Sequence, residues 1–468
     1  MRNITFLCLM LLSACGGVGV EAGAALTPTI TPQAGVLLSL WNEQAQRHEI
    51  RLVDPATGRD MPEHTLTTIS NNNLFALPAA IAPDGQNLVA AGSHGQSCEP
   101  YGGGSSCRPS ADELYFSHLP GGRRVTAALP GRGWLGPLAF HPITSTLALT
   151  YHTAKSSQLL LFDMDTGQLT DQRDLEFRPS LLRYDQEGTT LTIYGAPLGA
   201  EPGMSKPDWP QLSLLNAATL EVQWKRSLAG IISGSWCEEN CADSHEQRLM
   251  AHWSPAVVFS ADGRKLYIVH ADADKLTTVD FTAQTVSSVE LQAVRSWVEE
   301  FLAFTAGAVQ AKGAWQGAFK SAVLSADGAQ LYMLGQTTEA TRNAEGLWQS
   351  EQTFSGLQVI EVESGRKVAS YDAEASAISL TADGVYLLLS GWGKAGYGTE
   401  VLDAVTLERV KYLADWEVVA TRRIDGQPAI LASRADEQET HLALLDPQSF
   451  EVGPSWSVKG YASWVAVP

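Results

Sequence analysis

The chain has 468 residues, of which 44% are hydrophobic and 18% are charged, a composition typical of a globular protein. Its formal net charge is -19 at pH 7. An acidic balance of this size argues against a nucleic-acid partner and against electrostatic attachment to an anionic lipid surface.

Residues 1–14 are predicted to be a signal peptide. Arg2 provides a positive charge, and an apolar run over residues 4–12 follows it. That run is too short to span a bilayer. The four residues LSAC, which end at Cys15, then resemble the lipobox of bacterial lipoproteins. The resemblance implies cleavage before Cys15 and lipidation of its thiol, whereas the alternative is an ordinary secretory signal that contains a cysteine.

Residues 15–34 are predicted to form a lipidated, flexible tether. They are rich in Gly, Ala, Thr and Pro and show neither a helical nor a strand period. The first regular strands are expected at residues 36–41 and 49–53. We therefore expect one folded domain over residues 35–468, anchored outside the cytoplasm at a bacterial cell envelope.

A pattern of short strands repeats along this domain. In its clearest copy, which begins with residues 256–286, an apolar run precedes Asp262-Gly263 and three further runs follow, at residues 266–269, 275–281 and 285–291. Asp-Gly is a strong hairpin signal because both residues tolerate positive φ. Four short strands joined by tight turns make an antiparallel meander, which needs copies on either side to bury both faces. First strands are expected near Ala80, Leu138, Leu181, Val257, Ala322, Ala377, Val419 and Trp464.

These repeats resemble those of the YVTN-type β-propeller proteins, most closely over residues 267–280. The resemblance covers almost all of the chain from Gly35 and implies an all-β ring of four-stranded antiparallel blades. Eight first strands predict eight blades, with seven as the alternative because the copies near Leu181 and Val419 are poor. Residues 462–468 look like the first strand that the N-terminal blade lacks. We therefore expect this C-terminal strand to close the ring and remove its free sheet edges.

Six insertions interrupt the repeats, and several carry aromatic residues. One of them, residues 292–320, has apolar residues at helical spacing and predicts a short amphipathic helix. Tryptophan and tyrosine are enriched at interfaces, so those in insertions predict a surface for a protein or glycan partner, with packing between blades as the alternative. The other insertions cover residues 92–111, 197–210, 234–255, 337–356 and 391–398. The candidate surface comprises Trp209, Trp236, Trp348, Trp392 and Tyr397.

Four of the six cysteines fall as two close pairs, each within one insertion. In an exported protein this spacing predicts two disulfides, Cys98–Cys107 and Cys237–Cys241. The alternative for the second pair is a zinc site completed by two nearby histidines, since four N or S ligands satisfy Zn²⁺. An oxidising compartment favours the disulfide, so we predict no metal and no cofactor. The four zinc ligands in the alternative are Cys237, Cys241, His245 and His252.

No motif in the sequence identifies a catalytic site. It contains no Gly-x-Ser-x-Gly elbow, His-Glu-x-x-His pair or phosphate-binding glycine loop. Residues 270–274 have two aspartates at calcium-loop spacing, but Lys275 stands where the next ligand should be, so we expect a blade turn. The sequence favours a binding or scaffold module at the envelope. The alternative is a propeller enzyme, either a lactonase-like hydrolase or a redox enzyme subunit, with a site on the ring axis.

Overall fold

The computed structural model describes most of the predicted domain, within a compact unit formed by residues 33–468. The predicted signal peptide and tether, including Cys15, lie outside the described residues. The described ranges are 36–42, 47–54, 59–60, 66–67, 79–82, 87–92, 95–101, 104–118, 123–153, 156–197, 209–237, 250–291, 315–342, 348–393, 396–424, 427–436, 439–459 and 462–466.

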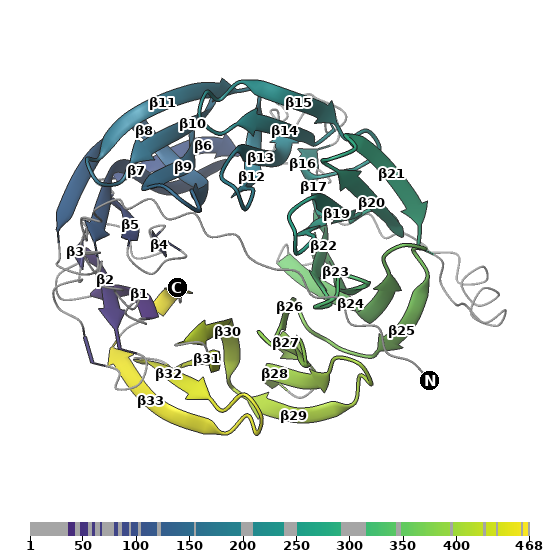
Figure 1. Ribbon diagram of the computed structural model, residues 1–468. Helices are drawn as coiled ribbons and strands as arrows, with labels where there is room; N and C mark the ends of the chain where they lie inside the picture. Colours follow the sequence, from purple (N-terminus) through teal and green to yellow (C-terminus); the bar gives the residue numbers. More distant parts are fainter. Residues whose placement is uncertain are drawn as a thin grey trace, which may run out of the picture. The chain divides into compact units, whose positions relative to one another are not determined.

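Every regular element in these ranges is a β-strand, and the strands form eight four-stranded antiparallel blades around a central axis (Figure 1). The strands from inner to outer are β34 (Ala462–Ala466), β1 (Val36–Asn42), β2 (Arg47–Val53) and β3 (Leu66–Thr67) in blade 1. Blade 2 has β4 (Ala79–Ile81), β5 (Asn87–Gly92), β7 (Gly104–His118) and the first half of β8 (Arg124–Phe140). Blade 3 has the second half of β8, then β9 (Thr146–His152), β10 (Ser157–Asp163) and β11 (Gln168–Leu175).

The remaining blades follow the same order. Blade 4 has β12 (Phe177–Tyr184), β13 (Thr190–Pro197), β14 (Gln211–Asn216) and β15 (Val222–Ser227), and blade 5 has β18 (Ala256–Phe259), β19 (Lys265–Val269), β20 (Lys275–Asp280) and β21 (Thr285–Glu290). Blade 6 has β22 (Trp315–Leu324), β23 (Gln330–Arg342), β24 (Trp348–Glu361) and β25 (Lys367–Tyr371). Blade 7 has β26 (Ala377–Leu380), β27 (Tyr386–Gly393), β28 (Gly396–Asp403) and β29 (Arg409–Ala414), and blade 8 has β30 (Glu417–Ile424), β31 (Gln427–Ala435), β32 (Glu439–Leu445) and β33 (Val452–Lys459).

The C-terminal strand closes the ring, which confirms the prediction from the sequence. β34 pairs antiparallel with β1 and places Val465 opposite Leu38. The eight expected first strands are all present, so the count of eight blades is also confirmed. Closure covers the edge of β1 that would otherwise offer unpaired N–H and C=O groups to another chain.

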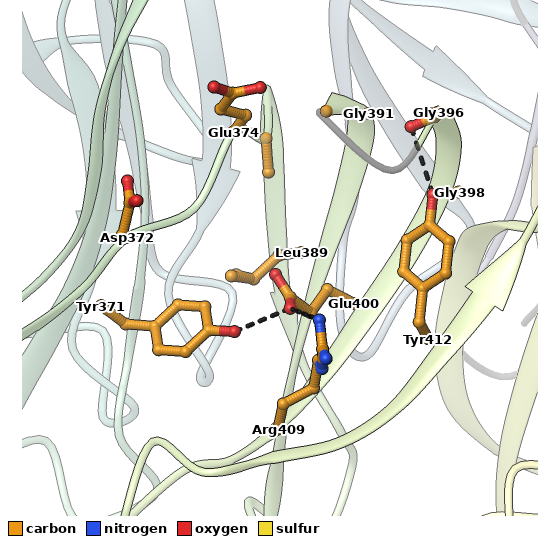
Figure 2. Close-up of a pocket in the computed structure, with 12 residues that line it drawn as sticks. Tyr371, Asp372, Glu374, Leu389, Gly391, Gly396, Gly398, Glu400, Arg409 and Tyr412 are labelled. Atoms are coloured by element: carbon orange, nitrogen blue, oxygen red, sulfur yellow. Dashed lines mark hydrogen bonds and ion pairs between the residues drawn. The ribbon is translucent and has the colours of Figure 1, made fainter.

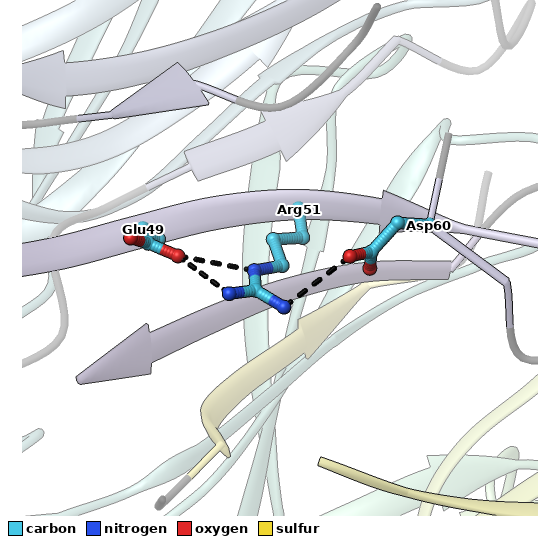
Figure 3. Close-up of polar contacts among 3 residues, drawn as sticks. All are labelled: Glu49, Arg51 and Asp60. Atoms are coloured by element: carbon cyan, nitrogen blue, oxygen red, sulfur yellow. Dashed lines mark hydrogen bonds and ion pairs between the residues drawn. The ribbon is translucent and has the colours of Figure 1, made fainter. Parts of the chain in front are cut away.

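A charged cluster stabilises the third strand of blade 1 (Figure 3). Arg51 on β2 donates from Nε and Nη2 to Glu49 Oε2 at 3.1 and 2.6 Å. Its Nη1 lies 3.3 Å from Asp60 Oδ2. Because Glu49 is buried, the bidentate guanidinium neutralises a carboxylate that would be costly to leave alone.

Apolar side chains between neighbouring blades form the core. On β19, Ile268 packs against Leu214 and Trp224 of blade 4, whereas Val269 packs against Met333 of blade 6. Successive side chains of a strand point to opposite faces of the sheet. The second strand of a blade therefore buries both of its faces, which explains why it reads in the sequence as an uninterrupted apolar run.

The connections between strands fall on two faces of the ring, because strand direction alternates within each blade. One face, called here the tight-turn face, carries the turns between strands one and two and between strands three and four. The other, the insertion-bearing face, carries the links between strands two and three and the crossings to the next blade. All six insertions predicted from the sequence begin and end at strand ends of the second kind, so their described ends share one face.

Three insertions contain strands where the sequence predicted loops or a turn. Residues 95–111 form the hairpin of β6 (Gly95–Tyr101) with β7, and residues 337–356 extend the hairpin of β23 with β24. Residues 391–398 likewise continue β27 into β28. Their polar and glycine-rich sequences lack the apolar alternation that predicts a strand, because these hairpins extend beyond the core.

A fourth insertion adds two strands to blade 6. β16 (Gly234–Cys237) pairs with β17 (Met250–Ser254), and β17 pairs in parallel with the inner strand β22. A helix was predicted within residues 292–320. Residues 292–314 lie outside the described residues, and residues 315–320 belong to β22. No helix in the described ranges has the length and apolar character of a membrane span.

Candidate functional site

The insertion-bearing face contains a cleft of about 190 Å³ between blades 6 and 7 (Figure 2). One wall is the segment that follows β25, and the other is the hairpin of β27 and β28 with part of β29. Its polar lining consists of Tyr371, Asp372, Glu374, Glu400, Arg409 and Tyr412, and the rest is Ala375, Leu389, Gly391, Gly393, Gly396 and Gly398.

Glycines make room for this cleft, because the two walls approach each other closely. A Cβ at Gly391 would lie 2.8 Å from Ser376 Oγ, and one at Gly393 would lie 2.9 Å from the carbonyl oxygen of Glu374. Gly391 pairs directly with Gly398 across the hairpin. The bare backbone of the hairpin therefore forms one wall, which allows a ligand to approach it closely.

Hydrogen bonds fix the polar side chains on the floor of the cleft. Tyr371 Oη donates to Glu400 Oε1 at 2.7 Å, and Arg409 Nη1 lies 3.4 Å from the same oxygen (Figure 2). Burial, together with this hydrogen bond and the charge of Glu400, raises the pKa of Tyr371 to about 12. Tyr371 is therefore a protonated donor at neutral pH, and Glu400 also forms an ion pair with Arg409.

A second tyrosine borders the same space. Tyr412 Oη donates to the carbonyl oxygens of Gly396 and Tyr397 at 3.2 and 3.3 Å. These bonds tie β29 to the tip of the glycine hairpin (Figure 2). Burial, Asp415 and Glu400 raise the pKa of Tyr412, so this hydroxyl also stays protonated.

An exposed aromatic pair stands on the tip of the hairpin. The side chain of Trp392 is 70% exposed, and its ring centroid lies 5.2 Å from that of Tyr397. The Tyr397 hydroxyl bonds the Glu417 carboxylate, and burial together with this bond raises its pKa. The bond to Glu417 thus fixes Tyr397, while the ring of Trp392 is exposed to solvent. This arrangement suits contact with a ligand.

The other predicted aromatic residues lie elsewhere on the insertion-bearing face. Trp209 precedes β14 in blade 4 and is 43% exposed, so it stands three blades away from Trp392. Trp236 lies on β16 and Trp348 begins β24, both in the sheet of blade 6. Among the predicted residues whose side chains the structure describes, Trp392 and Tyr397 form a ring pair.

The first predicted disulfide has a suitable backbone. Cys98 of β6 stands directly opposite Cys107 of β7 in antiparallel register. Directly opposed residues of such strands have Cα atoms about 4.5–5.5 Å apart, within the range that a disulfide spans. Cys237 ends β16, and Cys241 lies outside the described residues. Both disulfides stay predictions.

The alternative zinc site involves residues that the structure describes only in part. His252 on β17 packs against Phe319, and burial lowers its pKa. His245 lies outside the described residues. Within the described ranges, no group of three or more His, Cys, Asp or Glu is placed to hold a metal ion. The segment after β19 is a turn, as predicted, because the His270 amide donates to the Lys275 carbonyl at 3.0 Å.

No pattern in the sequence indicated the cleft residues outside the hairpin. Tyr371, Glu400 and Arg409 come from three strands of two blades, and each occupies an ordinary strand position. The one available signal was the Gly-rich segment 391–398, which predicted a turn with Trp392 and Tyr397. It did not indicate that the neighbouring blade supplies the opposite wall.

Comparison with known proteins defines the class of the chain. Its sequence matches no protein-family model and no curated protein sequence. Among solved structures it resembles a dihydro-haem d1 dehydrogenase at 13% identity, with a TM-score of 0.53, covering 92% of this chain and 76% of that one. This likeness and the ring of eight blades show a β-propeller.

Two lactonase structures are also similar, with lower scores. A putative 6-phosphogluconolactonase from Bacteroides uniformis has 14% identity and a TM-score of 0.44, covering 93% of this chain and 100% of that one. A periplasmic gluconolactonase from Pseudomonas aeruginosa has 17% identity and a TM-score of 0.42, covering 93% and 98%.

Proposed function

We propose that this β-propeller is a binding module of the bacterial cell envelope and that it recognises a glycan at the cleft between blades 6 and 7. The observation that carries the proposal is the combination of a walled cleft with an exposed aromatic ring beside it. Trp392 stands at the tip of the same hairpin that forms one wall.

The chemistry of the cleft suits a ligand rich in hydroxyl groups. The carboxylates of Asp372, Glu374 and Glu400 accept hydrogen bonds, and the Arg409 guanidinium donates them. The exposed ring of Trp392 offers an apolar face to the C–H side of a sugar ring. Polar groups placed by a rigid scaffold, next to an apolar contact, are the usual composition of a small-ligand site.

Attachment to the envelope is the second part of the proposal, and it rests on the LSAC segment that ends at Cys15. A lipid on Cys15 and the Gly- and Pro-containing tether would hold the propeller outside the cytoplasm. In a bacterial expression host, Cys15→Ser should block processing or release the protein from the membrane fraction. Normal processing with unchanged membrane retention would contradict the anchor.

Glycan binding is tested with the full-length protein in detergent on a panel of envelope and host glycans. Trp392→Ala and Glu400→Gln should each weaken binding at least about tenfold, a loss of roughly 1.4 kcal/mol. Trp209→Ala is the matched control, because it removes an exposed tryptophan from the same face in blade 4. The proposal fails if no glycan binds, or if both tryptophan variants lose the same affinity.

The same experiment also tests the alternative hypothesis that the propeller is an enzyme. Each glycan that binds is recovered and analysed for cleavage. Release of a shortened or oxidised product, lost in Glu400→Gln, would make the propeller an enzyme with its site in this cleft.

A further inference from the structure

A lysine and a serine meet over a glycine at the seam between blades 5 and 6. Lys320 on β22 pairs directly with Gly335 on β23. A Cβ at Gly335 would lie 2.8 Å from Lys320 Nζ and 2.4 Å from Ser355 Oγ. The amine and the hydroxyl therefore converge in the space that the missing side chain leaves.

Gly335 lies at a register shift between β23 and β24, but this bulge does not itself require a glycine. Gly335 is absent from the residues with positive φ, so any residue could adopt its conformation. Ser355 Oγ donates to the carbonyl oxygen of Gly335 at 3.2 Å, which fixes the hydroxyl beside the amine. A side chain at position 335 would fill the space beside this Cα. The Lys320 amine occupies that space in the structure.

The site lies at an accessible place in the fold. Phe319 of β22 pairs with Ser254, the last residue of β17. After Ser254 the chain crosses to blade 5, where β18 begins. Lys320 follows at that crossing and is half-buried, whereas Ser355 is exposed. A small molecule arriving at the insertion-bearing end of this seam would meet both groups.

The environment of Lys320 favours a neutral amine. Burial lowers its pKa, and Asp274 of blade 5, the charged group that acts on it, opposes that shift only in part. The described ion pairs do not include Lys320. Desolvation of a lysine without a neutralising partner is a recognised way to activate its nitrogen as a nucleophile.

We propose that Lys320 is a nucleophilic amine that captures small aldehydes as an imine, with Ser355 as its positioning and proton-transfer partner. The neutral nitrogen attacks the carbonyl carbon, and a proton passes from nitrogen to the carbonyl oxygen, giving a carbinolamine. Loss of that hydroxyl as water, with the second nitrogen proton, forms the C=N bond. One aldehyde and one amine thus give one imine and one water, without an oxidant or reductant.

The test uses acetaldehyde as the probe and cyanoborohydride to trap the imine on the full-length protein. Peptide mass mapping compares Lys320 with Lys265, an exposed lysine on the tight-turn side of blade 5. At pH 7 Lys320 should be alkylated several-fold faster than Lys265, because burial lowers the pKa of Lys320 and so raises the fraction of its amine that is neutral. Its rate should also reach half its maximum at a lower pH.

Variants separate a reactive site from an exposed lysine. Gly335→Ala should displace the amine and reduce labelling at Lys320 to the rate of Lys265, and Ser355→Ala should slow it several-fold. Lys265→Arg should leave labelling at Lys320 unchanged. Thermal melting checks that each variant folds. If Gly335→Ala does not fold, the labelling rate of Lys320 in Ser355→Ala tests the proposal instead. Equal labelling of the two lysines in the wild type, or no response to Ser355→Ala, would overturn the proposal.

Discussion

The two faces of the ring are stabilised by different kinds of polar contact. On the tight-turn face the same contact recurs from blade to blade. In blades 5, 6 and 7 a hydroxyl donates to the turn aspartate at 2.6 Å, and that aspartate accepts a backbone N–H at 3.0–3.1 Å. The hydroxyl and aspartate pairs are Ser260 with Asp262, Ser325 with Asp327, and Thr381 with Asp383.

At the insertion-bearing end each blade has its own contacts. In blade 5, His270 Nε2 lies 2.8 Å from Thr277 Oγ1, which lies 2.8 Å from Ser288 Oγ. In blade 7, Ser390 Oγ lies 2.8 Å from Thr399 Oγ1. Blade 3 uses neither arrangement and instead pairs a buried histidine with a serine, His152 Nδ1 with Ser157 Oγ at 2.8 Å.

This difference indicates how the fold divides stability from function. The repeated turns fix strand register in every blade with local bonds, which do not depend on neighbouring blades. The opposite end is then free to vary, and it holds the insertions, the cleft and the Lys320 seam. Substitutions on the tight-turn face should therefore change stability without changing binding, while those that line the cleft on the other face should change binding.

The largest effect should come from breaking the ring itself. Deleting residues 464–468 removes most of the strand that pairs with β1. The loss should amount to several kcal/mol of the free energy of unfolding, or cause aggregation through the exposed edge of β1. Thermal melting and light scattering would measure it, and a truncated protein with the parent's melting temperature would contradict the closure.

The next largest effect should follow from Thr277→Val in blade 5. Thr277 is 2% exposed, and its hydroxyl bridges His270 and Ser288. The variant keeps the shape but leaves the buried His270 Nε2 without its partner, which should cost about 1–3 kcal/mol. Urea unfolding would measure this loss, and Thr278→Val in the next position is the control. Equal stability of the two variants would count against the bridge.

On the tight-turn face, Asp403→Ala should cost about 1 kcal/mol. The carboxylate accepts backbone N–H bonds from Thr406 at 2.8 Å and Val405 at 2.9 Å, and these bonds lower its pKa. Asp403→Asn keeps an acceptor and should retain most of the stability, as Asn216 does in the equivalent turn of blade 4. Ligand binding should not change in either variant.

A smaller effect should appear on acidification. Burial lowers the pKa of His270 from 6.5, against the opposing charges of Asp272 and Glu290 and with the help of Lys275. The unfolded chain therefore takes up this proton first. The stability linked to His270 is complete above pH 6.5 and is lost as the pH falls towards the folded pKa. Urea unfolding between pH 8 and 5 should show a shallower slope for His270→Gln, and parallel slopes would contradict the assignment.

The sequence was sufficient to predict the ring because its signals are local. Asp262-Gly263 and the apolar run after it specify a turn and a buried strand without reference to the rest of the chain. The closing strand could also be predicted, because residues 462–466 carry the first-strand pattern. The same locality explains the count of eight blades.

The cleft could not be predicted, because it depends on which residues of two blades face each other. Tyr371 and Glu400 are 29 residues apart, and their bond forms only when blade 7 packs on blade 6. Nor did the sequence show that residues 250–254 join the sheet of blade 6, because a parallel partner at residues 315–319 has no local signal.

The smallest effect on stability should come from Trp392→Ala, and this variant sharpens the comparison between the faces. Trp392 is 70% exposed, and its indole pairs with the ring of Tyr397. Substitutions at such positions usually change stability by no more than about 0.5 kcal/mol. Large exposed aromatic residues cost solubility, so a protein that keeps one on a glycine-rich hairpin gains something other than stability from it. Urea unfolding should therefore give the parent's free energy, while glycan binding falls. A loss of more than 1 kcal/mol would make Trp392 part of the packing and remove the main support for the binding site.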